Sequence, residues 1–191
     1  MEAFLVSTGI VALAEIGDKT QLLSFVLAAR FRRPVPILLG ILFATLANHA
    51  AAGAAGAWVA QLLGPQTLRW VIALSFFGIA AWMFVPDKLG ENAAGPARFG
   101  VFATTLVAFF LVEIGDKTQI ATIALAARYP SLAAVVAGTT LGMLIANAPA
   151  VLLGERIAHR MPLRAIHLAA AVVFVALGAA TLLGAGEGLG F

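Results

Sequence analysis

The sequence predicts an all-α integral membrane protein whose six transmembrane helices form two inverted-topology repeats of three helices each. Three observations predict this fold: the composition, six long apolar stretches, and an acidic heptapeptide that occurs twice. Of the 191 residues, 62% are hydrophobic and only 11% are charged, and the mean hydropathy is +1.01. A water-soluble domain of this size needs more surface charge. The composition therefore excludes a soluble enzyme, a disordered chain and a nucleic-acid-binding module.

Six apolar stretches are long enough to be membrane-spanning helices, each of which needs about 20 residues. Prolines lie at or near several of their ends, where a helix tolerates proline. The predicted spans, in chain order, are Phe4–Ala29, Pro34–Leu63, Thr67–Val85, Phe99–Ala127, Ser131–Leu153 and Leu163–Leu183.

The basic residues predict the orientation of these spans. The loops after the even-numbered spans carry only Arg69 and Arg128, whereas the loops after the odd-numbered spans carry eight basic residues. Cytoplasmic loops are enriched in Lys and Arg, so we expect the odd-numbered loops in the cytoplasm and both termini on the extracytoplasmic side. The eight residues are Arg30, Arg32, Arg33, Lys88, Arg98, Arg156, Arg160 and Arg164.

The chain repeats an acidic motif. Residues 15–21 read Glu-Ile-Gly-Asp-Lys-Thr-Gln, and residues 113–119 read the same. Each half has three predicted spans, so the second half must enter the membrane from the opposite side, as in many secondary transporters. We expect a first repeat at 1–85, a cytoplasmic linker at 86–98 and a second repeat at 99–191, all within one membrane domain.

Ionisable side chains fall near the middle of the first and fourth spans, where each costs about 2.5–3.5 kcal/mol. Such groups persist when they pair, bind a ligand or line water. One interpretation is a structural ion pair within each motif, because a lysine four residues after a glutamate is well placed on a helix. The other is a binding site. The residues are Glu15, Asp18 and Lys19 in the first motif and Glu113, Asp116 and Lys117 in the second.

The spacing favours the binding site. Glu and Asp three residues apart lie on one helix face, and the intervening Gly17 and Gly115 let a backbone or an ion approach or let the helix break. Inverting one half onto the other brings both motifs together near the midplane. Further oxygens come from Thr20, Gln21, Thr118 and Gln119.

This pocket would hold four carboxylates and two ammonium groups, a net charge of −2 that one divalent cation or two protons would neutralise. Hard oxygen ligands suit Mn²⁺, Ca²⁺ and Mg²⁺. The absence of Cys from the chain, and of His from the motif, argues against Cu⁺ or Zn²⁺. The predicted metal ligands are Glu15, Asp18, Glu113 and Asp116, with Lys19 and Lys117 pairing with acids until the metal binds.

Three polar residues stand out in the second spans of the two halves, two in the first half and one in the second. Asn48 and Asn147 occupy similar places, and they either hold helices together or support the site and its pathway. His49 has no counterpart in the other half; a packed interface histidine is favoured over a proton carrier.

The duplicated Glu-x-Gly-Asp-Lys-Thr on the first and fourth of six spans resembles the Gdt1, or transmembrane protein 165, family, once catalogued as uncharacterised protein family 0016. The resemblance covers the whole chain. It implies a secondary transporter of Mn²⁺, and in some members Ca²⁺, driven by counter-transported protons; bacterial members look like manganese exporters in the plasma membrane. The matching positions are Glu15, Gly17, Asp18, Lys19 and Thr20, with Glu113, Gly115, Asp116, Lys117 and Thr118.

We therefore expect a non-enzymatic exporter of divalent cations, Mn²⁺ first and Ca²⁺ second, in a bacterial inner membrane. Its expected partners are metal ions, protons and lipid, without nucleic acid or a permanently bound cofactor; the oligomeric state stays open. Two alternatives remain: an exporter of a small organic cation or amino acid, and a membrane assembly factor that transports nothing. The residues show no nucleophile–base set that would support an intramembrane enzyme.

Overall fold

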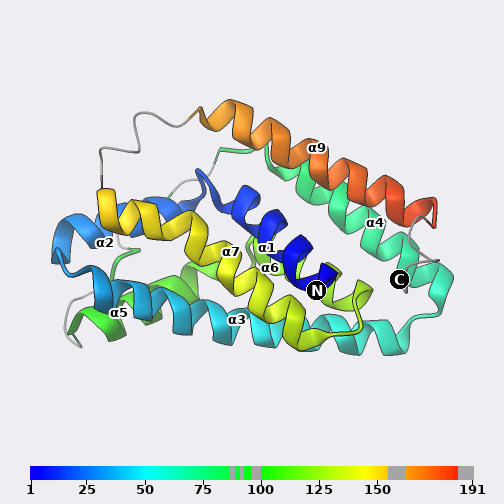
Figure 1. Cartoon of the computed structure of the whole chain (residues 1–191), viewed down its shortest axis with the longest axis horizontal. Coiled ribbons are helices and arrows are strands. Elements are labelled where there is room, and N and C mark those ends of the chain that lie inside the picture. Colours follow the sequence, from blue (N-terminus) through cyan, green and yellow to red (C-terminus); the bar gives the residue numbers. More distant parts are fainter. Residues whose placement is uncertain (87–88, 91–92, 96–99, 155–161, 185–191) are drawn as a thin grey trace.

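A computed structural model describes residues 1–86, 89–90, 93–95, 100–154 and 162–184, and over these residues it contains helices and no strand. Figure 1 shows the helices as a bundle along the long axis of the molecule. The helices are α1 (Glu2–Glu15), α2 (Lys19–Phe31), α3 (Pro34–Leu62), α4 (Pro65–Trp82), α5 (Gly100–Glu113), α6 (Lys117–Arg128), α7 (Leu132–Leu153) and α9 (Leu163–Leu182).

Local sequence signals set several helix ends. Pro34 and Pro65 occupy the first turns of α3 and α4. A backbone N–H in the first turn has no acceptor within the helix, so proline, which lacks this N–H, loses no hydrogen bond there. Arg32 adopts a left-handed conformation after α2, and the Ser131 hydroxyl accepts a hydrogen bond from the Ala134 N–H at the start of α7. These ends lie within a few residues of those predicted for the first, second, third and fifth spans.

Three helices in the described part of the chain are long and apolar enough to cross a membrane: α3, α7 and α9. They correspond to the predicted second, fifth and sixth spans. The helix α5 is apolar but has only 14 residues. The helix α4, the predicted third span, has 18 residues and carries Arg69 in its first turns.

The predicted first and fourth spans are each divided into two helices. The first pair breaks between Glu15 and Lys19, and the second breaks between Glu113 and Lys117. Gly17 (φ 88°) and Gly115 (φ 78°) lie in the left-handed region at these breaks, which glycine adopts without a Cβ clash. The predicted break at the glycine is confirmed. The predicted helical relation of Glu15 to Asp18 and Lys19, and its counterpart in the second motif, is wrong because no continuous helix joins them.

The two halves pack against each other through contacts between helices of one half and helices of the other. The helix α1 packs on α7 and α5 packs on α3, while α2 also contacts α7 and α6 also contacts α3. The helices α4 and α9 run side by side (Figure 1), and the buried rings of Phe76 and Phe174 lie 6.1 Å apart between them. This packing between the halves brings the two helix breaks together in the middle of the bundle.

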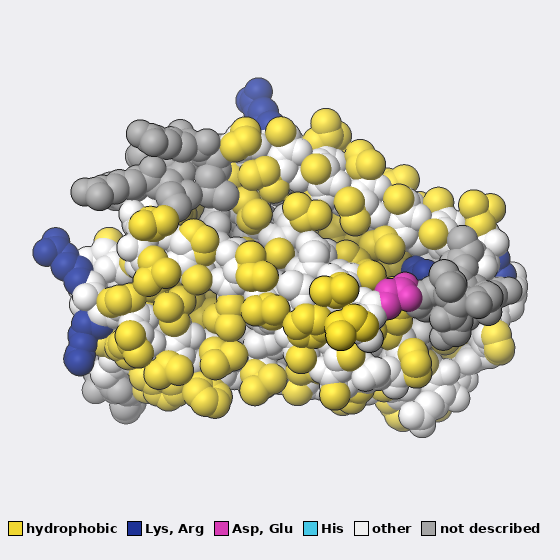
Figure 2. Space-filling model, in the orientation of Figure 1, with side chains coloured by type: hydrophobic (Ala, Val, Ile, Leu, Met, Phe, Trp, Pro, Cys, Tyr) yellow, Lys and Arg dark blue, Asp and Glu magenta, His cyan; other side chains and the backbone are white. Residues whose placement is uncertain are grey.

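The surface is apolar across the middle of the molecule. Figure 2 shows hydrophobic side chains spread over this face and charged side chains near its edges. In Figure 1 the α2–α3 junction and the start of α9 lie towards one end of the bundle, and the α3–α4 and α6–α7 junctions lie towards the other. Four basic residues of the orientation argument, Lys88, Arg98, Arg156 and Arg160, and most of the 86–98 linker lie outside the described residues.

Candidate metal site

The helix breaks hold four carboxylates in the interior. Glu15 is the last residue of α1 and Asp18 directly precedes α2, and Glu113 and Asp116 stand in the same relation to α5 and α6. Their exposed fractions are between 0% and 2%. The aspartates therefore lie at the amino ends of α2 and α6, where the helix dipole favours negative charge.

Three of these carboxylates form what we call the acidic cluster: Glu15, Glu113 and Asp116. Each offers one oxygen, and these oxygens all lie within 4.8 Å of one another. Glu15 Oε1 and Glu113 Oε2 are buried without a hydrogen-bond partner in the described part of the chain. Carboxylates this close repel unless a proton or a cation lies among them, and oxygen donors suit a hard divalent cation.

The fourth predicted ligand, Asp18, is not one of these three. Lys117 Nζ lies 2.6 Å from Asp18 Oδ1, and Lys19 Nζ lies 2.9 Å from Asp116 Oδ1. Each lysine thus contacts the aspartate of the other motif. The structural interpretation from the sequence, a pair of Glu15 with Lys19 and its counterpart, does not describe these contacts.

The two helix breaks differ in how they are covered. A Cβ on Gly17 would lie 2.8 Å from His167 Nε2 and 2.9 Å from Leu163 Cδ2, both on α9. A Cβ on Gly115 would meet no atom of the described residues within 4 Å, and the neighbouring Ile114 is 54% exposed. The first break is therefore packed under α9, whereas no described residue covers Gly115 at the second.

The threonines of the motifs hold the glutamates. The Thr20 hydroxyl donates to Glu15 Oε2, and the Thr118 hydroxyl donates to Glu113 Oε1 at 2.6 Å. Each contact fixes one oxygen of a glutamate and leaves the other without a hydrogen bond among the described residues. The threonines act on the cluster through these carboxylates.

The glutamines of the motifs form hydrogen bonds with the backbone at the helix breaks. Gln21 Oε1 accepts from the Gly17 N–H at 3.0 Å, and Gln119 Oε1 accepts from the Gly115 N–H at 2.8 Å. The side-chain amide of Gln21 donates to the Ala146 carbonyl at 2.8 Å. These contacts satisfy backbone groups that the breaks leave without a helical partner.

The two asparagines link the halves. Asn48 on α3 accepts from Gln119 and donates to the Phe110 carbonyl at 3.2 Å. Asn147 on α7 accepts from the Ser24 hydroxyl at 2.8 Å. Both side chains are buried, so each joins a helix of one half to the interrupted helix of the other.

Sequence reasoning did not place two histidines at the breaks. His49 Nε2 lies 3.5 Å from Glu113 Oε1, and the ring is fully buried. His167 Nε2 lies 3.0 Å from the Ile16 carbonyl at the first break. The position of His49 beside Asn48 in a predicted span was the only sequence signal for the first contact.

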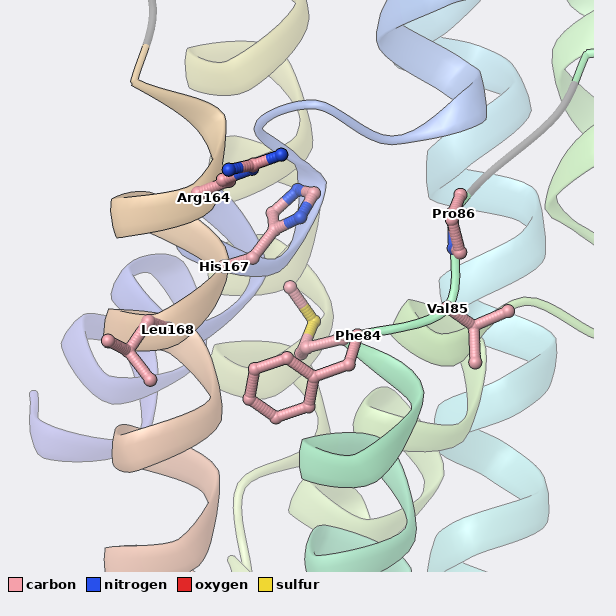
Figure 3. Close-up of a pocket in the computed structure, with 7 residues that line it drawn as sticks. Phe84, Val85, Pro86, Arg164, His167 and Leu168 are labelled. Atoms are coloured by element: carbon pink, nitrogen blue, oxygen red, sulfur yellow. The ribbon is translucent and has the colours of Figure 1, made fainter.

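A cavity of about 510 Å³ lies between the end of α4 and the start of α9. Figure 3 shows His167 on α9 directed towards the bend between α1 and α2. The lining residues are Met83, Phe84, Val85, Pro86, Arg164, His167 and Leu168. None of the carboxylates of the acidic cluster lines this cavity.

The apolar helices define a helical membrane protein, and the buried acidic cluster between its two helix breaks has the oxygen donors of a cation site. The chain belongs to the divalent cation/proton antiporter GDT1 family, whose sequence profile matches residues 3–91 and 101–188. It is therefore a membrane transporter.

Relatives extend this comparison. The chain is 50% identical over 182 residues to a Vibrio cholerae protein named "Putative manganese exporter", covering 95% of this chain and 90% of that protein. It is 28% identical over 187 residues to GDT1-like protein 4 of Oryza sativa subsp. indica, covering 84% and 66%. No solved structure matches the chain.

Proposed function

We propose that this protein exports divalent cations, Mn²⁺ first and Ca²⁺ second, across a bacterial inner membrane in exchange for protons. The observation that carries the proposal is the acidic cluster, whose three carboxylates lie within 4.8 Å of one another in the interior. Family membership supports cation/proton exchange, and the name of the Vibrio cholerae relative supports Mn²⁺.

The proposed membrane arrangement has six spans. With 14 and 13 residues, α1 and α2 are each about 20 Å long, which is less than the roughly 30 Å hydrocarbon core. We therefore count α1 with α2 as one interrupted span and α5 with α6 as another. The packing of helices of one half on helices of the other supports an inverted repeat. The excess of basic residues in the odd-numbered loops supports extracytoplasmic termini.

Asp116 allows a metal ion, the Lys19 ammonium and protons to compete at this site. It belongs to the acidic cluster and also contacts Lys19 at 2.9 Å. An arriving divalent cation and the Lys19 ammonium compete for the same carboxylate, so cation binding displaces the lysine. Protons compete for the same oxygens, and this competition couples the two fluxes. Rocking of the two halves about the breaks then exposes the site to alternate sides.

The size of the acidic cluster favours a bare ion over an organic cation. Three oxygens within 4.8 Å can surround an ion whose ligands lie about 2.1–2.6 Å away. An ammonium group with carbon substituents needs more room. The alternative of a transporter for small organic cations or amino acids therefore has less support.

Transport by the purified chain in proteoliposomes tests the function. We expect Mn²⁺ uptake into liposomes with an acidic lumen, slower Ca²⁺ uptake, and loss of uptake when an ionophore collapses the proton gradient. Glu2→Gln, which changes an exposed carboxylate, is the matched control and should transport normally. Mn²⁺ uptake that does not depend on the proton gradient would contradict the proposal, as would uptake that added amino acids abolish by competition.

A further inference from the structure

We propose that His49 supplies a nitrogen ligand to the cation bound at the acidic cluster and thereby selects Mn²⁺ over Ca²⁺. This inference rests on the transport function proposed above. It adds to the all-oxygen site expected from the sequence a nitrogen donor from α3, a helix outside both acidic motifs.

The distance between His49 and Glu113 fits two ligands of one ion. His49 Nε2 lies 3.5 Å from Glu113 Oε1, which is longer than the usual N–H···O distance of about 2.7–3.2 Å. Two atoms in neighbouring positions around a cation, each bonded at about 2.1 Å, lie about 3 Å apart. His49 is not one of the three residues whose ligand atoms all lie within 4.8 Å of one another, so a movement of either side chain would bring both atoms onto one metal ion.

The hydrogen bonding of His49 leaves it available. The ring is fully buried, and Nδ1 has no hydrogen-bond partner in the part of the chain that the structure describes. Nε2 makes a long contact to Glu113, whose Oε1 already accepts from Thr118 at 2.6 Å. Buried polar groups normally have partners, and a cation beside Glu113 would give Nε2 one.

The two halves differ at this position. Asn48 and Asn147 occupy similar places, so the counterpart of His49 is Ala148. An alanine offers no ligand, and Glu15 therefore has no matching imidazole from α7. The nitrogen donor is present on the Glu113 side alone, which makes the site asymmetric despite the duplicated motif.

An imidazole discriminates between the two candidate ions. Ca²⁺ binds six to eight oxygen atoms at about 2.3–2.6 Å, and imidazole is a ligand of the transition metals. Replacing one oxygen with a nitrogen therefore weakens Ca²⁺ binding more than Mn²⁺ binding. The carboxylates supply most of the attraction, and His49 supplies the preference.

Nitrogen ligation can be measured on the native protein. We expect the pulsed electron paramagnetic resonance spectrum of Mn²⁺-loaded protein to show ¹⁴N modulations that become ¹⁵N modulations after selective ¹⁵N-histidine labelling. The label enters all three histidines of the chain, so single substitutions are needed to assign the signal. His49→Gln should remove it. His167→Gln should keep it, because His167 contacts the Ile16 carbonyl and not the acidic cluster.

Transport selectivity gives the second readout. His49→Gln and His49→Asn each supply an amide oxygen, and we expect the Mn²⁺/Ca²⁺ ratio of uptake to fall by about tenfold or more while Ca²⁺ uptake continues. Persistent Ca²⁺ uptake also reports that the variants fold.

The outcomes separate the two proposals. Native protein that binds and transports Mn²⁺ without a histidine nitrogen signal would overturn the role of His49 and leave the exporter intact. Unchanged selectivity in folded His49 variants would do the same. Native protein that neither binds nor transports Mn²⁺ would instead overturn the proposed function.

Discussion

The ammonium group of Lys117 contacts Asp18 of the other acidic motif at 2.6 Å, with both side chains at most 1% exposed. The corresponding pair of Lys19 and Asp116 is separated by 2.9 Å, and Lys19 is 22% exposed. Two identical heptapeptides thus form two cross-motif ion pairs that differ in burial. The more exposed pair is the one that includes a residue of the acidic cluster.

The difference in burial predicts a difference in stability. Breaking a buried ion pair costs about 3–5 kcal/mol because the remaining charge is uncompensated. Lys117→Met should therefore lower the free energy of unfolding by about this amount, and Lys19→Met should lower it less because water still reaches that pair. Denaturant unfolding of each purified variant in detergent measures the difference. Equal losses would show that the burial difference has no energetic consequence.

The acidic cluster predicts different binding roles for the two aspartates. Asp116→Asn removes one of its carboxylates, so we expect Mn²⁺ affinity to fall by about tenfold or more. Asp18→Asn leaves the three carboxylates of the cluster in place and should reduce affinity less, although both changes should abolish efflux. Equilibrium binding of Mn²⁺ to purified protein, with Glu2→Gln as the control, measures this. A larger affinity loss in Asp18→Asn would mean that Asp18 is the main ligand.

The two glycines at the breaks should tolerate alanine unequally. Both have a positive φ, so alanine costs about 1–2 kcal/mol at either position. At Gly17 the added Cβ also meets His167 and Leu163 below 3.0 Å, whereas at Gly115 it meets none of the described residues within 4 Å. Gly17→Ala should therefore lower the melting temperature and transport more than Gly115→Ala. Equal effects on both would indicate that α9 does not restrain the first break.

Close packing of α3 on α6 depends on Gly56. A Cβ at this position would lie 2.2 Å from the Ile123 carbonyl oxygen, and overpacking of this kind costs about 1–3 kcal/mol. Gly78→Ala is the matched control, because its Cβ meets no atom within 4 Å in the part of the chain that the structure describes, and alanine favours the helix. Thermal unfolding should show destabilisation for Gly56→Ala alone; comparable melting temperatures for both variants would contradict the packing argument.

The sequence predicts much of this arrangement because several of its signals are local. Long apolar stretches gave α3, α7 and α9, and the glycine in each motif marked the break between two helices. The meeting of the two motifs followed from the expected inversion. Glu15, Glu113 and Asp116 indeed lie together.

Other features depend on packing that the sequence does not reveal. The helical spacing rule paired Lys19 with Glu15, but the backbone at Gly17 leaves the helix and directs the lysine to Asp116. His49 reaches Glu113 because one face of α3 packs on α5. No periodicity in α3 identifies that face, since the helix is apolar on nearly all sides.

The most direct test locates the ion itself. A structure of the Mn²⁺-loaded protein with anomalous scattering at the manganese edge should show one peak at the acidic cluster, about 2–2.5 Å from oxygens of Glu15, Glu113 and Asp116. A manganese peak elsewhere in the bundle, with these carboxylates still clustered without it, would contradict the account.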